Sequence, residues 1–204
     1  MELAQAIAET GPKGLADLIK LLLRPLQAEL LVSAAENPIH GARSAIERPS
    51  FFAEGHAPSL FSESMYVQLP KENYRILLAS YVVLPCPWER SRLTTTLAFI
   101  GNGKRWGKWQ QDSNHAVTIW LPWGLAFVNG GNHSITAGIL NGEGELTPRE
   151  VFDMSPVLDR MRCDGRHYFN QETGKIITKV TDHRIAAVFE IGRLMRTHGV
   201  TAFS

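Results

Sequence analysis

The sequence has little cysteine and almost no excess of charge of either sign. Its 204 residues include only Cys86 and Cys163, too few for the disulfide framework of a small secreted domain. The formal net charge is +1, so no general positive field attracts nucleic acid, and DNA would have to bind at a local basic patch. The composition therefore argues against disulfide-rich proteins and against strongly basic DNA-binding proteins.

The sequence also lacks long apolar runs, a signal-peptide pattern in its first residues and a metal-binding motif. The apolar run Leu18–Leu23 is interrupted by Lys20 and is far too short to cross a bilayer. The first residues lack the basic region and apolar run of a signal peptide, so we expect a cytoplasmic protein without membrane insertion. His115, Cys163 and His167 match no zinc spacing, and we expect no metal site from them.

Enough apolar sequence is present for a core and a helical arm. Hydrophobic residues make up 44% of the chain, which suffices for one domain with an arm. Apolar residues recur at helical spacing over residues 2–36, with a break near Gly11 and Pro12, so we expect an amphipathic arm of two helices. It should pack within the chain; pairing with a second copy is the alternative. Helix breakers over residues 37–62 predict a long loop, which gives an arm and loop over 1–62 and a main domain over 63–204.

The main domain is expected to be α+β, with a compact mixed sheet and a C-terminal helix. Apolar and alternating runs predict strands over residues 65–69, 74–84, 116–120, 125–128 and 150–153, and a hairpin of 166–169 with 175–179. Helical spacing predicts helices over residues 91–100, 133–140 and 182–198, the last ending at Gly199.

The segment Gly130-Gly131-Asn132-His133-Ser134 lies between a predicted strand and a predicted helix. Glycine allows positive φ and a close approach to a ligand, and the first amides of a helix carry the positive end of its dipole, so a phosphate suits this turn. Asn132 and Ser134 both have N-cap chemistry, and His133 would lie at the mouth of the turn. The alternative is a glycine turn with an ordinary cap and no ligand.

A second turn, Pro85-Cys86-Pro87-Trp88-Glu89-Arg90-Ser91-Arg92, also joins a strand to a helix. Over roughly residues 80–145 the two turns resemble the ParB/sulfiredoxin superfamily. Asn132 stands where sulfiredoxins have their nucleophilic cysteine, and Ser134 stands where the ParB type has arginine. Three features most resemble the Osa-type fertility-inhibition proteins of conjugative plasmids: the Asn-His-Ser form of the glycine turn, the helical arm and the overall length.

The resemblance implies a ParB/sulfiredoxin-like mixed sheet that binds and hydrolyses ATP and cleaves DNA, and so inhibits DNA transfer by a competing conjugation or type IV secretion system. The partners would be DNA and a component of that system, and the oligomeric state stays open. The two turns would together hold the nucleotide, through Gly130, Gly131, Asn132, His133, Ser134, Arg90 and Arg92.

The residue chemistry adds candidates for catalysis. Arg90 and Arg92 suit a phosphate held on the glycine turn; the alternative is a solvated first turn of the helix. Hydrolysis also needs a base or a metal ligand, and His133, Glu89 and Asn129 are the nearest candidates. Mg²⁺ is therefore a candidate cofactor beside ATP, although no metal motif supports it.

The segment Lys104-Arg105-Trp106-Gly107-Lys108-Trp109 interleaves cationic and indole side chains. Such a segment can hold a phosphate backbone and stack the bases of single-stranded DNA. The alternative is a turn whose tryptophans cover the edge of the core. Two other functions stay open: a non-catalytic adaptor that blocks a secretion or conjugation partner, and a ββα-metal nuclease with one divalent ion held near an Asn-His pair.

Overall fold

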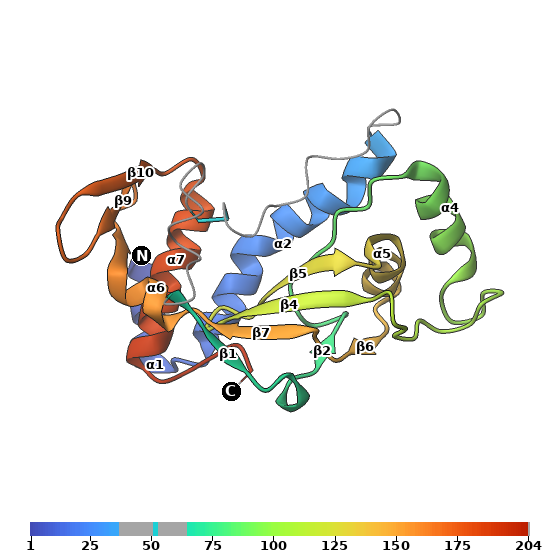
Figure 1. Ribbon diagram of the computed structural model, residues 1–204, viewed down its shortest axis with the longest axis horizontal. Coiled ribbons are helices and arrows are strands. Elements are labelled where there is room, and N and C mark those ends of the chain that lie inside the picture. Colours follow the sequence, from blue (N-terminus) through green and yellow to red (C-terminus); the bar gives the residue numbers. More distant parts are fainter. Residues whose placement is uncertain (37–50, 53–64, 204) are drawn as a thin grey trace.

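A five-stranded mixed sheet forms the middle of the fold (Figure 1). The computed structural model describes residues 1–36, 51–52 and 65–203. The strand order is β1-β7-β4-β5-β3, in which β4 pairs antiparallel with β5 and parallel with β7. The α+β class with a mixed sheet is therefore confirmed. The strands are β1 (Val67–Leu69), β3 (Val83–Leu84), β4 (Ala116–Leu121), β5 (Leu125–Gly130) and β7 (Glu150–Asp153).

Two smaller sheets and a set of helices complete the described part of the chain. One small sheet contains β8 (Met161–Cys163), β9 (His167–Asn170) and β10 (Ile176–Lys179), and the other pairs β2 (Ile76–Leu77) with β6 (Glu145–Leu146). The helices are α1 (Glu2–Thr10), α2 (Gly14–Glu36), the short 3₁₀ helix η3 (Lys71–Asn73), α4 (Arg90–Phe99), α5 (Asn132–Asn141), α6 (Ser155–Arg160) and α7 (His183–Thr197). None of these described helices combines the length and apolarity needed to cross a membrane.

Both faces of the central strand β4 are buried, and apart from Thr118 its residues are apolar. Trp120 belongs to a core cluster that also contains Leu23 of α2. Val117 lies on the opposite face of the strand and belongs to a second cluster, which contains Ile135 of α5. The arm and the glycine-turn helix are thus attached to the sheet through different clusters.

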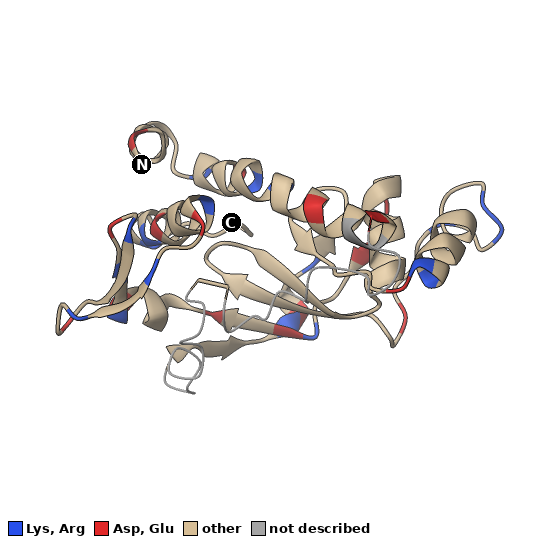
Figure 2. Cartoon of the chain, turned by 90° about the horizontal axis from the view of Figure 1, so that it is seen from above, with Lys and Arg blue, Asp and Glu red and all other residues tan. Residues whose placement is uncertain are grey.

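The N-terminal arm packs within the chain, as expected. α1 and α2 are separate helices with a break at residues 11–13, and both contact α7. Figure 2 shows α2 running along the length of the sheet. Apolar arm residues such as Leu15 and Leu30 lie in the same core cluster as Phe189 of α7. The arm is therefore part of the main core.

Most of the expected loop over residues 37–62 lies outside the described residues. The described pair, Phe51 and Phe52, packs on the sheet. The ring centroid of Phe51 lies 5.3 Å from that of Phe127, and that of Phe52 lies 4.7 Å from that of Trp123.

The predicted strand over residues 74–84 is wrong in one respect. It is divided into β2 and β3 by a turn, in which the amides of Ser80 and Tyr81 both donate to the Leu77 carbonyl. β2 pairs with β6, whereas β3 joins the main sheet, so the apolar run serves two sheets. The strands over 116–121, 125–130 and 150–153, the hairpin of β9 with β10, and helices α4, α5 and α7 lie where the sequence predicts them.

Candidate functional site

A hollow of about 470 Å³ opens between α4 and the start of α5. Its described lining contains one arginine, two indoles and many amide and hydroxyl groups, but no aspartate or glutamate. The hydroxyls of Ser91, Thr95 and Thr96 already donate to the Glu89 carboxylate and to carbonyls of α4, so the donors for a ligand come from the other lining residues. The lining residues are Trp88, Ser91, Arg92, Thr95, Thr96, Trp106, Asn114, Asn129, Gly130, Gly131, Asn132, His133 and Ser134.

The glycine turn has the backbone conformation that the sequence predicts. Gly131 is the N-cap of α5 and has a φ of 76°, in the left-handed region that favours glycine. A Cβ at this position would lie 2.3 Å from Cδ2 of His115. The lack of a side chain is therefore required by packing against His115, in addition to any close approach of a ligand.

Neither Asn132 nor Ser134 caps α5, so both N-cap predictions are wrong. Asn132 Oδ1 instead accepts a hydrogen bond from the Cys86 amide at 2.7 Å and joins the two turns. In the described structure no side chain caps α5, and the first helical hydrogen bond runs from the Ile135 amide to the Gly131 carbonyl. The amides of residues 132–134 thus precede the helical ladder, and all three residues line the hollow.

His133 fixes the second turn. Its Nε2 accepts a hydrogen bond from the Glu89 amide at 3.0 Å, and the side chain is buried. Burial lowers the pKa of His133, and the Arg92 charge lowers it further, against the opposing effect of Glu89. The ring is therefore neutral with its Nε2 lone pair occupied, which suits a positioning residue better than a general base.

Ser134 is held by two ring systems. The Asp112 amide donates to Nδ1 of His115 at 2.8 Å, so the proton of the neutral ring lies on Nε2. Nε2 lies 2.9 Å from Ser134 Oγ, which also accepts from the Trp109 indole at 3.0 Å. Because Ser134 Oγ accepts both hydrogen bonds, the hydroxyl retains its own hydrogen for a further acceptor.

The order Ser134, His115, Asp112 resembles a catalytic triad in distance alone. The Asp112 carboxylate lies 3.2 Å from Nδ1 of His115, with the serine on the other nitrogen. Burial lowers the pKa of His115, against the effect of Asp112. In the tautomer set by the Asp112 amide, His115 donates to Ser134 and cannot remove its proton. Ser134 therefore serves as a donor toward the hollow rather than as a nucleophile.

The two predicted arginines of the second turn point to different places. Arg92 lines the hollow, pairs with the Glu89 carboxylate at 2.8 Å and lies over the Trp88 ring. Arg90 does not line it, since its guanidinium donates to the Ala35 carbonyl at 2.7 Å, at the end of α2. The structure thus brings only Arg92 to the glycine turn.

Asn129 lines the hollow, whereas Glu89 is not among its lining residues. Asn129 Nδ2 donates to Thr118 Oγ1 at 2.9 Å, and Thr118 in turn donates to the Glu150 carboxylate at 3.0 Å. Asn129 is thereby oriented by the neighbouring strands. Glu89 also accepts from the Ser91 hydroxyl at 2.6 Å.

The Lys104–Trp109 segment is divided between scaffold and site. Trp109 is buried against His115 and cannot stack a base, so that part of the DNA prediction is wrong. Lys104 donates to the Leu97 carbonyl at 2.7 Å, and the Arg105 guanidinium lies over the Phe99 ring. Lys108 is exposed. Trp106 is exposed and lines the hollow.

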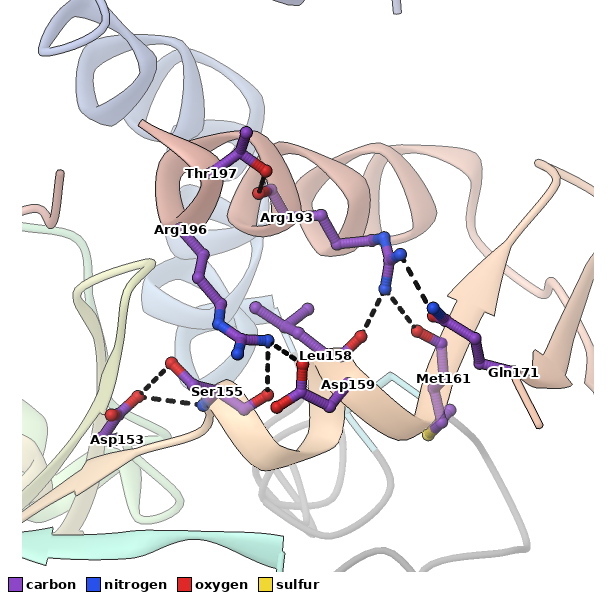
Figure 3. A network of polar contacts seen from close by, with 9 residues as sticks. All are labelled: Asp153, Ser155, Leu158, Asp159, Met161, Gln171, Arg193, Arg196 and Thr197. Atoms are coloured by element: carbon purple, nitrogen blue, oxygen red, sulfur yellow. Dashed lines mark hydrogen bonds and ion pairs between the residues drawn. The ribbon is translucent and has the colours of Figure 1, made fainter. Parts of the chain in front are cut away.

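The basic residues of α7 serve the fold. Figure 3 shows Arg193 donating to the Leu158 and Met161 carbonyls and Arg196 pairing with Asp159. These contacts fix α7 to α6 and β8. Both guanidinium groups are therefore engaged within the fold, and we do not assign Arg193 or Arg196 to a ligand site.

The residues that sequence reasoning missed here are His115, Asn114 and Trp88. Asn114 and His115 precede β4, and the Ala116–Gly130 register places His115 across from Gly131. A register worked out for the predicted hairpin would have found this contact. Trp88 adjoins the two predicted arginines, and its exposure is visible only in the structure.

The fold and the hollow define an α+β protein with a donor-lined site at a helix N-terminus. The chain belongs to a family of unknown function, DUF6710, whose model matches residues 1–202. The match spans the helical arm as well as the main domain. No curated protein and no solved structure matches the chain.

Proposed function

We propose that this protein binds the phosphates of ATP in the hollow, hydrolyses the nucleotide and cleaves DNA, and thereby inhibits DNA transfer by a competing conjugation or type IV secretion system. One observation carries the phosphate site: the uncapped amides of residues 132–134 share a carboxylate-free described lining with Arg92. Unpartnered helix amides and a guanidinium are the groups that bind phosphate in proteins. The resemblance to Osa-type proteins supports the DNA cleavage and the biological role.

Phosphate binding and base activation are linked through one ion pair. Arg92 and Glu89 are 2.8 Å apart, with side chains 64% and 38% exposed. An exposed pair contributes only about 0–1 kcal/mol, so a phosphate can draw Arg92 away at little cost. The released Glu89 carboxylate is then available to take a proton from an attacking water.

The remaining groups position the reaction. His133 orients Glu89 through its backbone amide, and Ser134 donates its hydroxyl to the phosphate. Arg92 and the α5 amides stabilise the charge that develops on the transferred phosphoryl group. DNA cleavage is a phosphodiester hydrolysis and uses the same donors and base.

Mg²⁺ would reach this site bound to the nucleotide. The described residues contain no group of three acidic, histidine or cysteine side chains that could hold a metal alone. The amide oxygen of Asn129 is the lining group suited to it, with the phosphates and water as the other ligands. Bound Mg²⁺ supplies charge neutralisation of the phosphates.

Hydrolysis of ATP by the Glu89→Gln variant tests this proposal. The amide keeps the size of the side chain but cannot accept a proton, so we expect nucleotide binding to persist and kcat to fall about 10²- to 10³-fold. Release of inorganic phosphate measures turnover, and titration calorimetry measures binding. Nucleotide binding without hydrolysis by the parent protein would favour the adaptor instead.

A further inference from the structure

Two tryptophan side chains are exposed at the wall of the hollow. Trp88 is 52% exposed and Trp106 is 56% exposed, and both belong to its lining. The other three tryptophans of the chain are buried. An exposed indole is a flat apolar surface that is favourably covered by another flat ring. The hollow therefore offers stacking surfaces beside its phosphate donors.

The two indoles lie at opposite ends of α4. Trp88 precedes the helix and contacts His133 at a centroid distance of 5.6 Å, while Trp106 packs on Phe99, the last helical residue, at 5.1 Å. The ten residues of α4 span about 15 Å. A base stacked on one ring lies only about 3.5–4 Å from it, so one base cannot stack on both indoles.

The surface between the indoles suits the backbone that joins two bases. It carries the Arg92 guanidinium on α4 and the amides of residues 132–134 at the start of α5. All of these attract or donate to phosphate oxygens. The described lining itself has no carboxylate, and the Glu89 carboxylate beside it is paired with Arg92.

We propose that the hollow binds single-stranded nucleic acid, with one base on Trp88, another on Trp106 and a linking phosphate at the first turn of α5. This inference rests on the proposed function, because it uses the same phosphate site, and it identifies the substrate as a strand. It also replaces the buried Trp109 with Trp88 as a stacking residue. Recognition by stacking and by backbone contacts is tolerant of sequence.

Fluorescence anisotropy with a labelled oligothymidylate of about ten nucleotides tests the inference. We expect Trp88→Ala and Trp106→Ala each to weaken strand binding about 10-fold, since each substitution removes one surface on which a base stacks. Trp88→Tyr and Trp106→Tyr keep a flat ring and should bind within about 3-fold of the parent. Ile176→Ala is the matched control, because Ile176 is a 59% exposed apolar residue of β10 outside the hollow.

ATP titrations of the same variants separate the inference from the proposed function. If the parent binds ATP and a variant with both Trp88→Ala and Trp106→Ala binds the strand as tightly as the parent, the strand inference is wrong and the nucleotide site stands. If the parent binds neither ATP nor the strand, the proposed function itself is wrong. Equal binding of oligouridylate assigns the site to both RNA and DNA strands, whereas a preference for oligothymidylate assigns it to DNA; either result supports the inference.

Discussion

The two buried histidines beside the hollow each accept a hydrogen bond from a backbone amide. His133 accepts from Glu89, and His115 accepts from Asp112. An imidazole can accept only when that nitrogen carries no proton, and burial lowers the pKa of both rings. Their shared role is to hold the Glu89 turn and Ser134 in place around the donor-rich wall.

Stability is predicted to fall as the pH drops below about 6.5, the ordinary pKa of histidine. The unfolded chain binds protons on His115 and His133 more readily than the folded chain does, so their contribution is present above that pKa and is lost as the pH falls through the lower folded pKa. Urea unfolding between about pH 7.5 and about pH 5.5 measures the loss.

The His133→Gln variant isolates one of these histidines. The glutamine amide oxygen can accept from the Glu89 amide, but the amide does not titrate. The unfolding free energy of the variant should therefore fall less than that of the parent when the pH is lowered. Burial raises the pKa of Glu190, which opposes this trend, and the difference between parent and variant removes that effect. An identical pH dependence in both proteins would contradict a neutral, accepting His133.

The glycine turn works through its fit to the neighbouring strand. Gly131 combines a left-handed φ with a side that faces His115, whereas Gly142, at the other end of α5, has a φ of 65° and no atom near its Cβ position. A substitution at Gly142 therefore tests backbone strain alone, whereas one at Gly131 tests strain together with packing against His115.

We predict that Gly131→Ala destabilises the fold more than Gly142→Ala. Both substitutions place alanine at positive φ, which costs about 1–2 kcal/mol, but only the first also displaces His115. The additional loss should be about 1–3 kcal/mol, measured as unfolding free energy in urea. Equal losses in the two variants would mean that His115 moves aside freely and does not hold the turn.

A helix or strand is predictable from the sequence when the residues that specify it lie within one short segment. α5 and its flanking strand β5 were predicted because glycine, apolar alternation and helical spacing all lie in one segment. The division of residues 74–84 into two strands is not predictable from that segment alone. It depends on two distant pairing partners, β6 for Ile76 and β5 for Val83. The short helix α6 and strand β8 gave too few residues for a periodic signal.

The site was predictable only where its residues share a turn. Arg92, His133 and Ser134 were found because each lies in one of the two turns. The roles of His115 and Trp109 depend on contacts with a serine 19 and 25 residues away along the chain. Local patterns do not report such contacts, and the same limit led to the assignment of Trp109 to a DNA surface.

At the scale of the whole molecule, charge along the described part of the chain is of mixed sign. Figure 2 shows Lys and Arg interleaved with Asp and Glu along the chain, in keeping with the formal net charge of +1. Under the proposed function, a few local groups near the hollow would therefore have to attract the nucleic acid. Such binding depends only weakly on salt.

We predict a shallow salt dependence of DNA binding. A contact with about two to four phosphates of a single strand gives a slope of about −1.4 to −2.8 in log K against log salt. Changing Lys104, Arg105 and Lys108 together to alanine should flatten this slope and weaken binding similarly for unrelated sequences. Anisotropy at several salt concentrations measures both. If the triple variant shows the same salt slope as the parent, the Lys104–Trp109 segment does not contact DNA and serves only the fold.

The most direct test of the phosphate site compares two arginines that lie two positions apart. Arg92 lines the hollow, whereas Arg90 donates to the Ala35 carbonyl outside it. Calorimetric titration with ATP and Mg²⁺ should show binding by the parent, a loss of about 10- to 100-fold in Arg92→Ala, and affinity within about 2-fold of the parent in Arg90→Ala. Absence of binding by the parent, or equal affinities of the two variants, would contradict the account.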